Sequence, residues 1–141
     1  EEAQDYFFLL SRSLNLLSEM TRNHESLLVF FYLKLLDVSG LLPVLSHCVR
    51  CKKPVRDICF LDADAGGVVC SSCSAGMGEK IFAGSVKIIE QLAVADSTML
   101  ERIRISPVSL NEMLRALNQY IVFHTGRQLK SSAFLRSIAA L

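Results

Sequence analysis

The sequence predicts a mainly α-helical domain: a compact bundle of about five or six helices with a small β-hairpin inserted. Apolar residues recur at three- and four-residue steps on both sides of the chain's centre, which is typical of helices that bury one face. Two cysteine pairs enclose a β-favouring segment within residues 47–75. The 141 residues, 51% of them hydrophobic and 21% charged, are enough for a single domain over residues 1–141.

The first helix is expected close to the N-terminus. Four apolar side chains there lie three or four positions apart and would form a single stripe along a helix. They are Phe7, Leu10, Leu14 and Leu17. Because a helix in a bundle buries its apolar stripe, we expect this stripe to face the core.

The second helix is expected to be the central one. Asn23 can cap its start, and the helix runs toward Val38, where Gly40 ends it and Pro43 prevents an early restart. Its residues 27–36 are apolar nearly all round, as in a helix surrounded by other elements. This apolar segment contains one lysine and is about half of the ~20 residues that a membrane span requires. We therefore expect a buried helix.

A hairpin bounded by two cysteine pairs follows. Each pair has the pattern Cys-x-x-Cys, and 18 residues separate the pairs. Residues 55–61 favour a strand, residues 62–67 favour a turn, and Val68-Val69 leads back to the second pair. Each pair can present two thiolates from one tight turn, so the hairpin would bring four sulfurs together. The four residues are Cys48, Cys51, Cys70 and Cys73.

This layout is that of a zinc ribbon inserted at residues 47–75. Four thiolates fill the tetrahedral positions of one Zn²⁺ and leave none for a catalytic water, so the sequence predicts one structural ion. Cys59 lies within the predicted strand, where a cysteine is usually a small buried apolar residue. His47 adjoins the first pair, and we expect it to be a surface or capping residue because four cysteines complete the ligand set.

Two other uses of the cysteines fit less well. The five cysteines are an odd number, and the N-terminus lacks the basic and apolar parts of a signal peptide, which disfavours a secreted disulfide framework. A redox-active Cys-x-x-Cys pair precedes a helix, whereas Pro54 and a predicted strand follow the first pair. A redox switch is thus the weakest of the interpretations.

Basic residues form two groups that are candidates for contact with DNA or a partner. The first group, around the first cysteine pair, consists of Arg50, Lys52, Lys53 and Arg56. The second, after the last long helix, consists of Arg127, Lys130 and Arg136. The alternative is that the first group offsets the negative charge of zinc thiolates and the second binds helix C-terminal carbonyls. Both interpretations stay open.

Helices are expected again after the hairpin. Glycines mark an irregular link over residues 76–84, and Ser85 can then cap a third helix. A short helical segment over residues 98–103 can follow. The longest predicted helix follows these two segments.

That helix has a doubled start signal. Ser106 offers a cap with Pro107 in the first turn, and Ser109 with Glu112 can form a capping box. Gly126 supplies the stop. A final helix is expected after it. Ser131 or Ser132 can cap this helix, which carries Phe134, Leu135 and Ile138.

Signatures of common enzymes are missing. The sequence has no phosphate-binding loop, dinucleotide-binding glycine turn, HExxH helix or GxSxG elbow. Its three histidines lie in unrelated segments, and no interleaving of basic and aromatic residues marks a platform for stacking bases. The formal net charge is +1, so contact with nucleic acid must come from local patches. We predict that the protein is not an enzyme.

Four segments, in their order along the chain, resemble the RecO family of bacterial recombination mediators. They are Gly40-Leu41-Leu42-Pro43, the first cysteine pair, Ala65-Gly66-Gly67-Val68-Val69 before the second pair, and His124-Thr125-Gly126-Arg127-Gln128-Leu129-Lys130-Ser131. Zinc ribbons alone are common, but the glycine lead-in and the terminal segment are specific in combination. The resemblance spans nearly the whole chain.

The resemblance implies an N-terminal OB-fold followed by a mostly helical domain that carries zinc in many members. This chain, which lacks an initial methionine, would be the second part only, with the OB-fold absent. The whole protein would be a non-enzymatic mediator of DNA repair and recombination. It would help load recombinase onto single-stranded DNA coated with single-strand-binding protein, and it would anneal complementary strands.

The partners implied by the resemblance are the acidic C-terminal tail of single-strand-binding protein, RecR, and single- and double-stranded DNA, mainly through the OB-fold. An apolar groove rimmed by Arg or Lys would suit that tail, and the sequence does not locate it. The implied location is the bacterial cytoplasm, at the nucleoid and away from membranes. The alternative from another class is a structural zinc-ribbon module of an unrelated transcription or translation assembly.

Overall fold

The structure, a computed structural model, describes residues 2–96 and 98–125. This part of the chain forms four helices, which are α1 (Glu2–Glu19), α2 (His24–Val38), α3 (Ala83–Ala93) and α4 (Pro107–Thr125). It also forms three strands, which are β1 (Ile58–Asp62), β2 (Gly67–Cys70) and β3 (Glu79–Phe82). The predicted mainly helical class is confirmed. The predicted number of five or six helices is wrong for the described residues.

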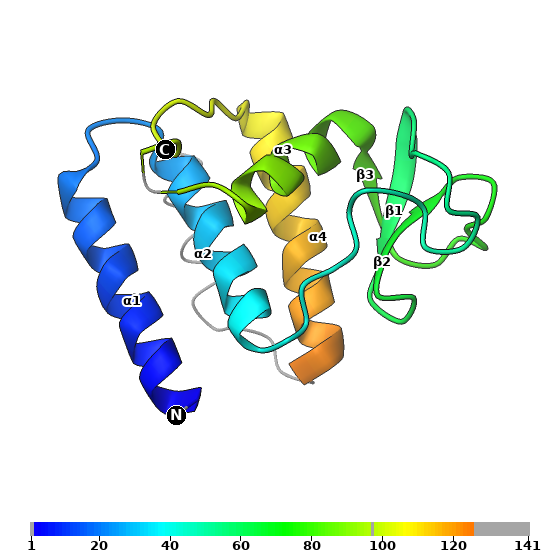
Figure 1. Ribbon diagram of the computed structural model, residues 1–141. Coiled ribbons are helices and arrows are strands. Elements are labelled where there is room, and N and C mark those ends of the chain that lie inside the picture. The colour runs from blue at the N-terminus through cyan, green and yellow to red at the C-terminus, as the bar shows by residue number, and fades with distance from the viewer. Residues whose placement is uncertain (1, 97, 126–141) are drawn as a thin grey trace.

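Figure 1 shows α2 between α1 and α4, with the sheet at the opposite end of the molecule from α1. α2 contacts each of the other three helices, and its Val29 and Leu33 are fully buried. Its predicted central position is therefore confirmed. Among the described residues, no helix is long and apolar enough to cross a membrane.

The boundaries of α2 are as predicted, but Asn23 acts differently. Asn23 has a left-handed backbone, with φ 58°, and its side chain does not cap the helix. Its Nδ2 donates instead to the carbonyl of Glu101, while its own carbonyl accepts a 2.7 Å hydrogen bond from Ser26 Oγ. Gly40 follows the other end of the helix with φ 71°, a conformation that glycine adopts without steric cost.

The apolar stripe predicted to bury α1 lies on the wrong face. Phe7, Leu10, Leu14 and Leu17 are between 49% and 72% exposed. The buried residues of α1 are Leu9, Ser13 and Leu16, Met20 just after the helix is also buried, and α1 packs against α2. α1 has apolar residues on more than one face, so its periodicity alone could not select the buried one.

The sheet has the order β2-β1-β3, and both neighbouring pairs are antiparallel. The predicted strand over residues 55–61 begins later, at Ile58, because Asp57 has φ 54° and interrupts the extended backbone. The hairpin of β1 and β2 is as expected, whereas β3 was not predicted. Glycines precede β3, and only Ile81 among its four residues is fully buried, so its sequence pattern is weak.

The hydrophobic core joins the inner face of the sheet to the helices. The strands contribute Cys59, Leu61, Val68 and Ile81. The helices contribute, among others, Leu33, Ile89, Leu92, Met113 and Leu117. The sheet is therefore packed as part of the domain rather than standing apart on a linker.

The start of α3 depends on a residue of α4. α3 begins two residues before Ser85, and Ser85 Oγ donates to Glu112 Oε2 at 2.6 Å instead of capping the helix. Phe82 N donates to Glu112 Oε1 at 2.7 Å. The predicted capping box of Ser109 with Glu112 is therefore wrong. Ser106 caps α4 alone, because its Oγ accepts from Ser109 N at 3.2 Å.

Residues 98–102 form turns rather than the short helix that the sequence predicted. Asp96 Oδ1 accepts hydrogen bonds from Thr98 N and Met99 N, which holds the chain in a turn. α4 then starts at Pro107 as predicted. The predicted stop at Gly126 and the final helix lie outside the described residues.

Candidate metal centre

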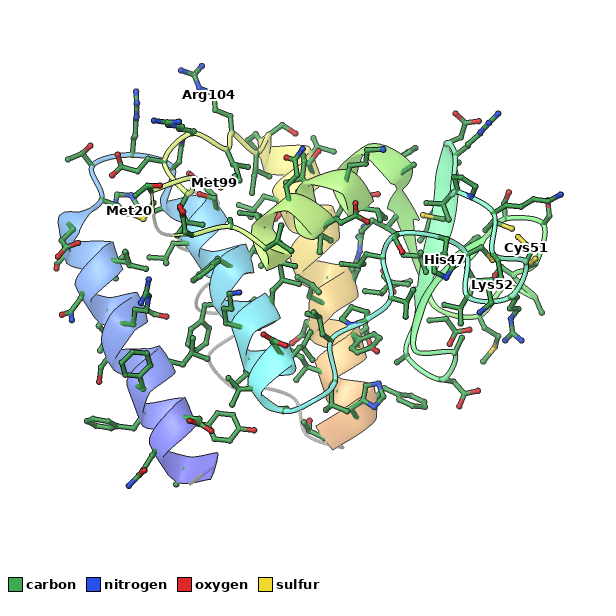
Figure 2. The ribbon with its side chains drawn as sticks, viewed as in Figure 1. Met20, His47, Cys51, Lys52, Met99 and Arg104 are labelled. Carbon is green, nitrogen blue, oxygen red and sulfur yellow. The ribbon has the colours of Figure 1, made fainter. Side chains whose placement is uncertain are left out.

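The structure brings the four predicted cysteines together at the sheet end of the molecule. Cys48 and Cys51 precede β1, Cys70 is the last residue of β2, and Cys73 lies in the following turn. Their Sγ atoms all lie within 4.8 Å of one another. In Figure 2, Cys51 lies at the end of the molecule opposite α1.

Each cysteine pair is held by a tight backbone turn. In the first, Lys52 N donates to Cys48 O and Cys48 N donates to Lys53 O, both at 2.9 Å. In the second, Cys73 N and Ser74 N both donate to Cys70 O, at 3.1 and 2.9 Å. The turns aim both side chains of each pair in one direction, as the Cys-x-x-Cys pattern predicts.

The first pair is also tied to β2 by the segment before it. Val44 N donates to Gly66 O, Val68 N donates to Val44 O, and Val49 N donates to Val68 O. Gly66 has φ 85°, and a Cβ on Gly67 would lie 2.8 Å from the backbone nitrogen of Val44. The two glycines before the second pair are therefore needed for the turn and for this close approach.

The spacing of Cys51 and Cys70 matches that of two ligands of a tetrahedral zinc ion. Four thiolates bound at the usual zinc–sulfur distance would have their sulfurs about 3.8 Å apart. The Sγ atoms of Cys51 and Cys70 are 3.8 Å apart. Cys70 N also donates to Cys48 Sγ at 3.3 Å, a contact of the kind that orients metal-bound thiolates. The cluster could therefore hold one metal ion.

The electrostatics of the cluster favour a bound cation. Burial opposes ionisation of Cys48, but backbone hydrogen bonds, beginning with that of Cys51, outweigh it and lower the pKa of its thiol to about 6. The pKa of Cys73 rises to about 12, chiefly because its thiol hydrogen-bonds with Cys70. Zinc binds cysteine as the thiolate, and four thiolates this close together need a positive ion to offset their charge.

The two residues that the sequence excluded are outside the cluster. Cys59 is fully buried, its Sγ donates to Ile81 O at 3.3 Å, and burial raises the pKa of its thiol to about 11. His47 Nδ1 hydrogen-bonds with Ser46 Oγ at 2.9 Å. The predicted assignment of Cys59 to the core is confirmed.

The first basic group surrounds the first cysteine pair in the sequence, and its side chains are exposed to solvent. Its members are Arg50, Lys52, Lys53 and Arg56. In Figure 2, Lys52 lies next to Cys51 at this end of the molecule. Arg127 and Lys130, from the second group, lie outside the described residues.

A cavity that the sequence did not reveal lies between α1 and α2, with a volume of about 390 Å³. Phe8 and Leu9 of α1 and Phe30 and Val38 of α2 supply its apolar walls. The charged residues around it are Asp5, Arg12, Lys34 and Asp96. These residues come from three distant segments, so no linear motif marks the cavity.

The chain matches the family described as Recombination protein O C terminal over residues 1–133. It is 35% identical over 138 residues to the DNA repair protein RecO of Symbiobacterium thermophilum, covering 94% of this chain and 54% of that protein. It is 31% identical over 146 residues to the RecO of Desulfatibacillum aliphaticivorans, covering 98% of this chain and 56% of that protein. No solved structure matches the chain.

The chain spans about half the length of the curated relatives that it matches. The chain is also 30% identical over 123 residues to the RecO of Alkaliphilus metalliredigens. That alignment covers 86% of this chain and 50% of that protein. The family match covers the helices, the sheet and the cysteine cluster together. The chain therefore belongs to the RecO family of DNA repair proteins.

Proposed function

We propose that this chain, as part of a longer protein, serves as a recombination mediator. The whole protein would help load recombinase onto single-stranded DNA coated with single-strand-binding protein, anneal complementary strands and act with RecR. The observation that carries the proposal is the family match over residues 1–133. The role needs no bond-making chemistry, so we propose that the protein is not an enzyme. We also propose that it acts in the bacterial cytoplasm. The relatives give no support to the alternative of a transcription or translation module.

In this proposal residues 1–141 are one helical domain with the ribbon of residues 47–75 inserted, and an N-terminal OB-fold supplies most of the DNA contact. The ribbon would hold one Zn²⁺ through Cys48, Cys51, Cys70 and Cys73. Four protein thiolates leave no open position on the ion, which makes it structural. It would tie the loop before β1 to the end of β2.

The cavity between α1 and α2 is our candidate for docking the tail of single-strand-binding protein. An acidic, apolar tail needs a pocket for apolar side chains and cations for its carboxylates. Phe8 and Phe30 offer the first, and Arg12 and Lys34 offer the second. Lys34 Nζ donates to Ala93 O at 3.0 Å, which leaves other ammonium hydrogens for a carboxylate.

The acidic residues of the cavity restrict how such a tail could lie. Asp5 and Asp96 also line it and would repel a peptide carboxylate. Asp96 Oδ1 accepts a 2.6 Å hydrogen bond from Thr98 Oγ1, which lowers the pKa of Asp96 and keeps it charged. We therefore expect the carboxylates of the tail to meet Arg12 and Lys34, away from these two acids.

The test uses the 141-residue chain and a labelled peptide of the tail, with binding followed by fluorescence anisotropy at low salt. Arg12→Glu should weaken binding by about tenfold or more, because it places a like charge against the peptide. Arg22→Glu is the matched control, since Arg22 is an exposed arginine that does not line the cavity. Equal losses for both variants, or no binding by the unaltered chain, would contradict this docking site.

We also propose that the exposed basic group contacts DNA phosphates. The group consists of Arg50, Lys52, Lys53 and Arg56, and Arg127 and Lys130 are further candidates. Each phosphate contact contributes about 0.7 to 0.9 to the slope of log affinity against log salt. Changing Lys52 and Lys53 to Gln should reduce that slope by about 1.4 to 1.8. An unchanged slope would favour the alternative, in which these lysines only offset thiolate charge.

A further inference from the structure

Over β1 and β3, one face of the sheet points away from the hydrophobic core, whereas Val69 of β2, opposite Phe60 on that face, is buried. The registers place Ile58 opposite Phe82 and Phe60 opposite Lys80, on β1 and β3. Cys59, Leu61 and Ile81 alternate with these residues and belong to the core. Because successive side chains of a strand point to opposite faces, Ile58, Phe60, Lys80 and Phe82 share the outer face. We call these four residues the outer sheet face.

The outer sheet face is open to solvent over β3. Phe82 is 50% exposed and Lys80 is exposed, while Phe60 and Ile58 are half-buried. Lys80 Nζ lies 5.8 Å from the centroid of the Phe82 ring. The face therefore carries two aromatic rings and one cation. Phe60 and Phe82 are 22 positions apart in the sequence, and strand pairing brings them to one face.

We propose that the outer sheet face binds single-stranded nucleic acid by stacking bases on Phe60 and Phe82. The proposal deepens the DNA role proposed above and rests on it. Every base has a π-face, so aromatic side chains on an open sheet accept successive bases with little sequence preference. Phe60 and Phe82 are diagonal neighbours on paired strands, about 7 to 8 Å apart. An extended strand could place one base on each ring.

Charge on this face suits a polyanion. Lys80 lies directly opposite Phe60 and two residues before Phe82, where it can meet a phosphate. Exposed Lys52 lies at the same end of the molecule (Figure 2). The neighbouring acid Glu79 is paired with Arg115 at 2.8 Å. Asp62 Oδ1 accepts hydrogen bonds from Asp64 N and Ala65 N, so its charge is engaged in the turn.

The outer sheet face is held in position from two sides. Phe82 N donates to Glu112 Oε1 at 2.7 Å, and Ala83 N donates to Asp57 O at 2.8 Å, which fixes the end of β3. β2, which pairs with β1 along its length, ends in Cys70 of the cysteine cluster. A ligand that stacks here would meet rings whose backbone needs no rearrangement, which lowers the entropic cost of binding.

The experiment measures binding of the 141-residue chain to a short fluorescent oligothymidine at low salt. Phe82→Ala should weaken binding by about 5- to 150-fold, the loss of one stacked base, and Phe82→Tyr should retain it. Lys80→Gln should reduce the salt slope by about 0.7. Phe7→Ala, which removes a 72% exposed ring of α1, is the matched control and should bind as the unaltered chain does.

Three outcomes would overturn the proposal: Phe82→Ala that binds like the unaltered chain, an equal loss in Phe7→Ala, or no binding of oligothymidine by the folded chain. Phe60 is half-buried, so its truncation could also destabilise the fold. Binding by Phe60→Ala therefore tests the proposal only if that variant keeps the melting temperature of the unaltered chain, and Phe82→Ala is the deciding variant if it does not. The tail peptide separates this proposal from the proposed function. Phe82→Ala should bind that peptide normally. A chain that binds the peptide but not oligothymidine contradicts both the outer sheet face and the phosphate contact of the basic group, whereas Phe82→Ala that binds oligothymidine like the unaltered chain contradicts the outer sheet face alone.

Discussion

The side chains of Glu112 and Ser85, 27 residues apart, form a buried hydrogen bond of 2.6 Å between Oε2 and Oγ. The other carboxylate oxygen accepts from Phe82 N. Glu112 is 7% exposed, and it connects α4 to the junction of β3 and α3. One residue thus joins the helical bundle to the sheet that carries the cysteine cluster.

We expect Glu112→Gln to lower the free energy of unfolding by about 1 to 3 kcal/mol, because the amide turns a donor toward one of the two buried donors. Urea denaturation followed by circular dichroism measures this loss. Glu79→Gln is the matched control: it breaks an ion pair with Arg115, which is 56% exposed, and should cost no more than about 1 kcal/mol. Equal losses of stability in the two variants would show that the buried hydrogen bonds of Glu112 contribute no more than an exposed ion pair.

Removal of the metal should unfold at least the hairpin. Structural zinc contributes roughly 10 to 16 kcal/mol in small finger peptides, which is comparable with the net stability of a domain. We expect one zinc per chain by elemental analysis, and we expect Cys51→Ser and Cys70→Ser to lose it and become poorly soluble. Cys59→Ser should keep the metal. Ligand variants with unchanged metal content and folding would contradict the assignment.

The five thiols should differ in their rate of alkylation. Cys59 is fully buried, and burial raises the pKa of its thiol to about 11, so it should react only on unfolding. The other four should be protected by bound metal, and they should react after chelation because the hairpin then unfolds and their thiols reach solvent. Mass spectrometry of alkylated peptides before and after chelator addition measures both rates. Labelling of Cys59 as fast as Cys73 in the chelated protein would instead indicate that the core opens with the ribbon.

Gly67→Ala should destabilise the protein because its Cβ would collide with the backbone of Val44. We expect a loss of about 1 to 3 kcal/mol in the free energy of unfolding, with weaker metal retention. Gly84→Ala is the control, since a Cβ there meets nothing within 4 Å and the residue lies in α3. That substitution should be neutral or stabilising by up to about 1 kcal/mol. Similar melting temperatures for both variants would argue against the close approach.

Two leucines of α1 test which of its faces is buried. Leu16 is 8% exposed and belongs to the core, whereas Leu14 is 57% exposed. Leu16→Ala should cost about 2 to 5 kcal/mol of stability, and Leu14→Ala no more than about 1 kcal/mol. Chemical denaturation of both variants measures the difference. A larger loss of stability in Leu14→Ala than in Leu16→Ala would indicate that the apolar stripe predicted from the helical periodicity is the buried face.

Local chemistry made part of this protein predictable from its sequence. The cysteine tetrad follows from the geometry of two Cys-x-x-Cys turns joined by a hairpin, and the structure brings the four sulfurs together. The start of α4 at Pro107 and the end of α2 before Gly40 follow from proline, serine and glycine, whose effects act within a turn. The family could be identified from such short segments, because each one carries its own constraint.

Contacts between distant segments decided the rest. Periodicity could not select the buried face of α1, since that choice depends on what α2 presents to it. Glu112 has a local partner available in Ser109, yet it binds Ser85 and Phe82, because packing of α4 against β3 brings them closer to its carboxylate. Phe60 and Phe82 share a face only because β1 pairs with β3 in one register. The four cysteines that cluster and the family can be predicted from short sequence segments. Which other side chains meet depends on strand register and helix packing, because both involve the whole core.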